Sequence, residues 1–156
     1  MIAIEQIDVR KPILESPDFG NDQIKTIQSA LAEGQAAEVR QHWQELTSRA
    51  SSQRDLLAAG IIAYMLAHQN KAIEYLSQVQ GSGLGSFYQA QAQFSLENYG
   101  EARSLFEQAK KSGYDPILCD LLIAGSVRLS GDTDEAEKML RGLAREAATR
   151  AEYSYQ

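Results

Sequence analysis

The chain alternates apolar stretches of helical length with short polar breaks, and three segments share this arrangement. They span residues 56–79, 86–109 and 120–143. Each segment reads as an apolar helix, a polar break, and a second helix whose large apolar residues recur at helical spacing. The predicted breaks are residues 68–70, 97–98 and 131–133, which contain the Asn, Gly and Asp residues that favour helix ends and caps. The pattern therefore predicts three helix–turn–helix units.

Small residues recur at fixed places in these units. The first helix and the second helix of each unit carry one small residue each, and the pairs are Gly60 with Ala72, Ala90 with Ala102, and Ala124 with Ala136. The sequence interval between the two members is identical in all three pairs. Helices approach closely where their side chains are small, so a constant interval predicts a constant crossing point.

The units follow one another with a period typical of a repeat protein. Each unit lies roughly 30–34 residues after the one before it, and both small residues of a pair advance by the same step. A weaker copy precedes them, because Ile27 and Val39 are separated by the same interval and lie about one such period before Gly60 and Ala72. We expect this copy to be a degenerate capping helix pair, with Gly34 at its break.

The pattern resembles the tetratricopeptide repeat, a helix–turn–helix unit of about 34 residues. The clearest match lies in residues 97–116, at Tyr99, Ala102, Phe106, Ala109 and Pro116. The resemblance extends over residues 21–150 and implies an all-α fold, a right-handed α-solenoid of antiparallel helix pairs.

The expected organisation follows from this register. It comprises an N-terminal arm (1–20), the degenerate pair (21–52), three repeats (53–82, 83–116 and 117–150) and the start of a further, truncated repeat (151–156). The arm is apolar at alternate or near-alternate positions and could be a short strand or one amphipathic turn. Pro12 and Pro17 exclude a long helix there.

Charge and composition exclude several classes of partner. The net charge of −6 argues against an electrostatic nucleic-acid binder and against docking on an anionic membrane. No apolar run approaches the length of a membrane span, and Glu5 and Asp8 interrupt any signal-peptide core. The single cysteine, Cys119, fits a reducing compartment. A cytoplasmic location is the simplest interpretation.

No set of residues assembles a recognisable catalytic or metal site. His42 and His68 belong to different units and have no partner at metal-ligand spacing. Cys119 follows the helix start Asp115–Pro116, but its leucine neighbours favour simple packing. The glycine-rich residues 81–86 lack the strand and the Lys-Ser/Thr pair of a phosphate loop and favour a turn. We therefore expect a protein that is not an enzyme and that needs no cofactor or metal.

The resemblance places a partner site on the concave groove, which the first helices line in this family. The positions in register are Leu57, Ile61, Tyr64, Met65, Phe87, Tyr88, Gln91, Phe94, Ser95, Leu121, Gly125, Arg128 and Leu129. The central positions Ile61, Gln91 and Gly125 lack the Lys and Asn with which the family holds carboxylates. An apolar peptide or amphipathic helix is the expected ligand.

Several functions are compatible with such a module. The leading hypothesis is a non-catalytic scaffold for another protein. The alternatives are a self-associating structural module, which would make the chain a homo-oligomer, a bacterial secretion-type chaperone, and a regulatory domain of a larger protein.

Overall fold

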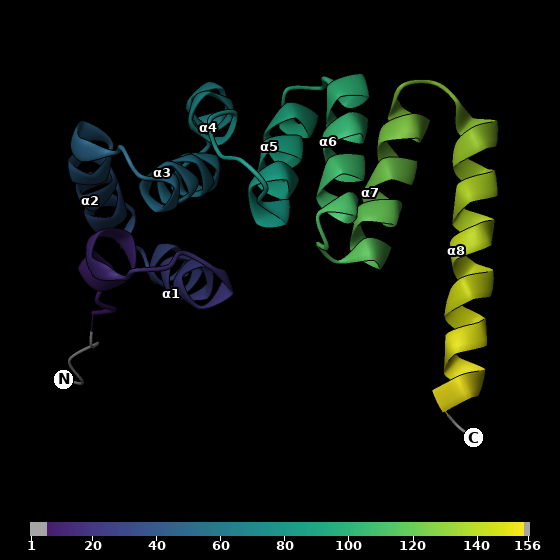
Figure 1. Cartoon of the computed structure of the whole chain (residues 1–156), viewed down its shortest axis with the longest axis horizontal. Coiled ribbons are helices and arrows are strands. Elements are labelled where there is room, and N and C mark those ends of the chain that lie inside the picture. Colours follow the sequence, from purple (N-terminus) through teal and green to yellow (C-terminus); the bar gives the residue numbers. More distant parts are fainter. Residues whose placement is uncertain (1–5, 155–156) are drawn as a thin grey trace. The chain divides into compact units, whose positions relative to one another are not determined.

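The computed structural model describes residues 6–154, with side chains as far as Thr149. The chain forms two compact units, residues 1–80 and 81–156. The first contains a π-helical turn, η1 (Lys11–Glu15), and α1 (Asn21–Ala32), α2 (Ala36–Arg49), α3 (Gln53–Met65) and α4 (Gln69–Leu76). The second contains α5 (Gly83–Ser95), α6 (Tyr99–Lys111), α7 (Pro116–Leu129) and α8 (Thr133–Ser154) (Figure 1). The expectation of an all-α chain of consecutively packed helices is confirmed over these residues, where no strand occurs.

The N-terminal segment packs onto the helices of the first unit instead of forming a strand. Val9, Ile13 and Phe19 are buried. Three polar side chains hold its backbone: Gln35 both donates to Ile7 O and accepts from Ile7 N, each at 2.9 Å, Arg54 donates to Ile13 O at 2.7 Å and Pro12 O at 2.8 Å, and Arg49 donates to Leu14 O at 2.7 Å. Because buried carbonyls need donors, these bonds replace the ladder that a strand would have supplied. Of the expected apolar positions, Ile2 and Ile4 lie outside the described residues.

Helices α3 and α4 cross at the predicted pair of small residues. Gly60 and Ala72 are both buried. A Cβ atom placed on Gly60 would collide with Leu76 Cγ, and it would lie 2.6 Å from Leu76 Cδ2 and 3.3 Å from Ala72 O. Glycine is therefore required here by the close approach of the two helices, as the fixed interval predicted.

The turns inside the four helix pairs share one backbone geometry. One residue in each turn has a positive φ: Gly34 at 87°, Ala67 at 64°, Glu97 at 63° and Gly131 at 104°. The N–H of the next residue bonds to a carbonyl in the last turn of the preceding helix in every case: Gln35 to Ala30 at 2.9 Å, His68 to Ala63 at 2.8 Å, Asn98 to Gln93 at 2.9 Å and Asp132 to Val127 at 3.2 Å. This is the bonding of a Schellman cap. The positive-φ residues recur at the same sequence intervals as the small residues.

This shared geometry has a consequence for stability. Ala67 and Glu97 adopt the left-handed conformation, which destabilises the folded state by about 1–2 kcal/mol when the residue has a Cβ atom. Glycine avoids this strain, but its more flexible unfolded state offsets about 0.5–1 kcal/mol of the gain. We expect Ala67→Gly and Glu97→Gly each to raise the free energy of unfolding by about 0.5–1 kcal/mol in urea titrations. The matched control, Gly131→Ala, should lower it by a similar amount. A loss of stability in either glycine variant would contradict this account.

The second unit has a core cluster of aromatic, aliphatic and small side chains. Phe106 of α6 is fully buried, with Ala90, Ala102 and Ala136 around it in one apolar cluster. The cluster also includes Cys119, whose predicted packing role is thereby confirmed. At the start of this unit, Ser82 accepts from Gly85 N at 2.9 Å, so residues 81–86 form a turn and a helix start.

Helix α8 differs from the other second helices in length. It has 22 residues, against 13 in α6 and 14 in α2. It continues without a break to Ser154, so the described part of the chain contains no helix start at Ala151, where a further unit was expected. Residues 155 and 156 lie outside that part.

Candidate functional site

The predicted contact residues of the first unit lie on α3, a helix that is apolar over most of its circumference. Ile61 has no exposed surface, and Leu57, Tyr64 and Met65 are half-buried. Residues 58–63 are all buried because a helix that is apolar on several sides packs on several sides. The expectation that Ile61 lines an open groove is therefore wrong.

The predicted residues of α5 serve mainly in the packing of the second unit. Phe87 is only 5% exposed, and its ring stacks on Tyr114 with centroids 4.3 Å apart. Phe87 lies three positions before the small residue Ala90, which places both on the core-facing side of the helix. Its assignment to an open groove was therefore wrong.

The other predicted positions of α5 keep part of their surface. Tyr88, Gln91 and Phe94 are half-buried, and Ser95 is exposed. Phe94 meets Tyr99 edge-on at 5.2 Å, and Tyr88 meets Phe87 edge-on at 5.5 Å. These contacts hold the two aromatic rings against the core cluster, so part of each ring is covered.

Most of the predicted residues of α7 are exposed. Leu121 is 45% exposed and Leu129 46%, and Arg128 is exposed as well. Ile117, which periodicity did not reveal as a contact residue, is 39% exposed and lies one helical turn before Leu121. We call the surface formed by Ile117, Leu121, Gly125, Arg128 and Leu129 the outer face of α7, because steps of three or four positions place these residues along one side of the helix.

Two features make the outer face of α7 suitable for docking. A Cβ atom on Gly125 would meet no atom within 4 Å, so the surface is open at its centre. The guanidinium of Arg128 has no ion-pair partner within residues 6–149, so it is available to a carboxylate. The face thus combines exposed apolar side chains with one uncompensated cation.

A second surface lies between α6, α7 and α8, where two adjoining cavities of about 340 and 490 Å³ share Asp120, Ile123 and Met139. We call it the α6–α8 groove. Its further lining residues are Glu107, Lys110 and Lys111 of α6 and Gly142, Leu143 and Glu146 of α8. The sequence pattern did not reveal this surface, because its residues come from three helices and each resembles an ordinary packing or solvent-facing position.

Carboxylates dominate the electrostatics around Lys110 in this groove. Lys110 Nζ lies 2.8 and 3.0 Å from the two carboxylate oxygens of Asp120. The hydrogen bond to Asp120 raises the lysine pKa above its usual value, and the charges of Asp120 and Glu146 add to the effect. Burial raises the pKa of the neighbouring Cys119 thiol, so this thiol stays protonated at neutral pH and lacks the thiolate character of a nucleophile.

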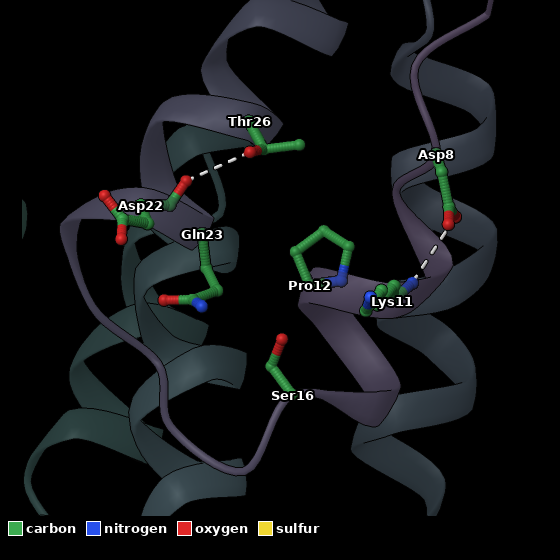
Figure 2. A pocket seen from close by; sticks show the side chains of 7 residues that line it. All are labelled: Asp8, Lys11, Pro12, Ser16, Asp22, Gln23 and Thr26. Atoms are coloured by element: carbon green, nitrogen blue, oxygen red, sulfur yellow. Dashed lines mark hydrogen bonds between the residues drawn. The ribbon is translucent and has the colours of Figure 1, made fainter.

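A third cavity, of about 270 Å³, lies between the N-terminal segment and α1 (Figure 2). Asp8, Lys11 and Ser16 face Asp22 and Gln23 across it. Asp8 Oδ1 accepts from Lys11 N at 3.4 Å and Gln23 Oε1 accepts from Gly20 N at 2.9 Å. Asp8 thus bonds to the first residue of η1 and Gln23 to the residue before α1, and the cavity has mixed charge.

The histidines and acidic residues form no metal centre in the described residues. His68 is exposed and stacks on Trp43 with centroids 5.6 Å apart, and His42 Nδ1 lies 4.0 Å from Glu45 Oε2. Within residues 6–149 no three side chains of His, Cys, Asp or Glu converge as metal ligands would. Among the helices that the structure describes, none has the length and apolar character needed to cross a bilayer.

Comparison with known proteins identified no relative. A scan against protein-family models, a search of curated proteins and a search of solved structures each returned no match for this chain. The function must therefore be argued from the surfaces described above.

Proposed function

We propose that the chain is a non-catalytic scaffold that binds an amphipathic segment of another protein, and that its helix pairs form a tetratricopeptide-like right-handed solenoid. The recurring Schellman turns, which follow the same intervals as the small residues, support the solenoid, because equivalent turns place equivalent helix faces in register. In a solenoid, the first helix of each pair contributes to a continuous binding surface, and α7 is the first helix of its pair.

The observation that carries the binding function is the outer face of α7. Isolated exposed leucines are common, but three large apolar side chains aligned on one helix form a patch that a partner can bury. The unpaired Arg128 at the end of this patch selects a partner with a carboxylate beside its apolar side chains. The favoured ligand is therefore an amphipathic helix with leucine-like residues on one face and an acidic residue at the edge of that face.

A designed amphipathic helical peptide, with leucine on one face and glutamate elsewhere, tests this function by fluorescence anisotropy. We expect Gly125→Leu to weaken its binding more than tenfold, because the new side chain occupies the open centre of the face. Arg128→Gln should weaken binding about two- to fivefold, because an exposed ion pair contributes a change in affinity of this size. The Cβ atom of the new residue meets no atom within 4 Å, and leucine improves helix propensity, so we expect the variant to stay folded.

Two controls make the result decisive. A peptide of the same composition in scrambled order should not bind, and both variants should retain the circular dichroism spectrum of the parent chain. Binding of the leucine–glutamate peptide that is insensitive to Gly125→Leu would rule out the outer face of α7 as the site.

A further inference from the structure

The part of the N-terminal segment that we call the η1 segment, residues 7–15, is held by the first unit as a bound peptide would be. Its backbone bonds to the helices through side chains of one partner set, which we call the segment site: Gln35, Arg49 and Arg54. Gln35 bonds to both backbone groups of Ile7 at 2.9 Å, and the two arginines donate to three consecutive carbonyls of η1 at 2.7 to 2.8 Å. Because these bonds are made to the main chain, they supply affinity for the segment whichever copy of the chain it belongs to.

The η1 segment carries its own contact side chains and its own turn. Val9 and Ile13 are almost completely buried, and Leu14 is 8% exposed. The turn that presents them is closed by bonds inside the segment or to the residue after it: Ile13 N donates to Val9 O at 3.2 Å, and Ser16 N donates to Lys11 O at 2.9 Å. The segment can therefore leave the site and bind again as one piece.

A short exposed stretch joins the η1 segment to α1. Pro17 and Asp18 are exposed and make no hydrogen bond within residues 6–149. Phe19, the next residue, is buried, and its ring centroid lies 5.6 Å from the guanidinium carbon of Arg54. A change of backbone angles at Pro17 and Asp18 can therefore move the η1 segment while Phe19 stays packed. Exchange of an element between two copies requires a hinge of this kind.

We propose that the η1 segment of one copy occupies the segment site of a second copy, so that two chains exchange their N-terminal segments. The occupant follows from the structure, because the segment seated on the site belongs to this chain. The exchanged dimer remakes each contact of the closed monomer, so the two states differ mainly in hinge conformation and association entropy. A short tether gives the chain's own segment an effective concentration on the order of 1 mM, so the parent chain is monomeric at micromolar concentration.

Two substitutions separate the segment from its site. Ile13→Asp spoils the segment, because a carboxylate would have to be buried without a partner, and it leaves the site intact. Arg54→Met removes the donors to two carbonyls and leaves the segment intact. An equimolar mixture then contains one intact segment and one intact site, on different chains. We expect light scattering to show a one-to-one heterodimer at least tenfold tighter than the self-association of either variant.

Two controls assign the heterodimer to the segment site. An excess of a synthetic peptide of residues 6–18 should dissociate it by competing for the intact site, and the same peptide with Ile13→Asp should not. Arg40→Met changes an exposed arginine of α2 outside the site. Its mixture with the Ile13→Asp chain should associate no more strongly than a mixture of that chain with the parent.

The exchange proposal is overturned if the folded Ile13→Asp and Arg54→Met chains do not associate when mixed, or if either variant associates with itself as strongly as the mixture does. Ile13→Asp alone could unfold the first unit, and the parent peptide of residues 6–18 should then restore the parent fluorescence of Trp43, because binding stabilises the folded state. Failure to restore it would also overturn the proposal.

This proposal and the proposed function fail independently. The segment site lies in the first unit, whereas the outer face of α7 lies in the second. The leucine–glutamate peptide should therefore bind the Ile13→Asp and Arg54→Met chains as it binds the parent. Absence of that binding in all three chains would count against the proposed function alone, and absence of the heterodimer would count against segment exchange alone.

Discussion

Replacing Phe106 by alanine is expected to lower the free energy of unfolding of the second unit by about 3–5 kcal/mol. Phe106 is fully buried, and its ring meets Phe87 edge-on at 5.7 Å. Four of the buried residues in its cluster are alanines, whose short side chains cannot reach into the space that the ring would vacate. The loss therefore combines the transfer free energy of the ring with the cost of an unfilled cavity.

The effect can be assigned to the second unit because the chain carries a natural reporter in each unit. The single cysteine, Cys119, is buried in the Phe106 cluster, and the single tryptophan, Trp43, lies in the first unit. We expect Phe106→Ala to speed labelling of Cys119 by a thiol reagent and to lower its urea midpoint. Gln108→Ala, an exposed change on the same helix, should shift stability by less than about 0.5 kcal/mol. Unchanged protection of Cys119 in Phe106→Ala would show that this cluster does not hold the unit together.

Replacing Gly60 by alanine should destabilise the first unit by about 2 kcal/mol, although a glycine-to-alanine change inside a helix ordinarily stabilises by about 0.5–1 kcal/mol. The sign is reversed because the new methyl group would collide with Leu76 and press against Ala72 O at 3.3 Å. Either Leu76 leaves its packed position or the two helices move apart, and each response costs contacts across the crossing.

A double-mutant cycle identifies Leu76 as the cause. Leu76→Ala alone should cost about 2–5 kcal/mol, but adding Gly60→Ala to that background should be neutral or stabilising, because the colliding atoms are gone. Trp43 fluorescence is a suitable probe, since its indole donates to Ala59 O at 2.9 Å, next to Gly60. Gly142→Ala, a helix-interior change in open space, is the matched control and should stabilise the chain. Additive effects in the cycle would contradict a direct clash.

The fold was largely predictable because its signals are local. Helix and turn preferences act over a few residues, so the break predicted at 97–98 lies in the turn after α5 and the break at 131–133 overlaps the turn after α7. The break predicted at 68–70 lies too late by about two residues, because α3 ends at Met65 and α4 already begins at Gln69. Asp115 accepts from Leu118 N at 3.2 Å and α7 begins at Pro116, as the sequence signals at that helix start predicted. The constant interval between paired small residues also identified the α3–α4 crossing, because it depends on residue size at two points of one helix pair.

The candidate surfaces were less predictable because exposure depends on which neighbour covers each side of a helix. Periodicity places Phe87 and Leu121 on defined sides of α5 and α7, but it does not show that Tyr114 covers the first while the second remains open. The α6–α8 groove was missed for the same reason, since no single helix carries its pattern.

The sequence by itself determined the helices, the turns between paired helices and the small residues at one close crossing, because each depends on the conformational preferences and sizes of residues near one another in the chain. Only the tertiary structure decided how the N-terminal segment is held, which predicted contact residues are buried and where the open surfaces lie. Arg54 bonds to the distant carbonyls of Pro12 and Ile13, and the cavities between α6, α7 and α8 arise where three helices meet. Such features depend on long-range packing, in which the free energy of each contact is set by all the elements that meet there.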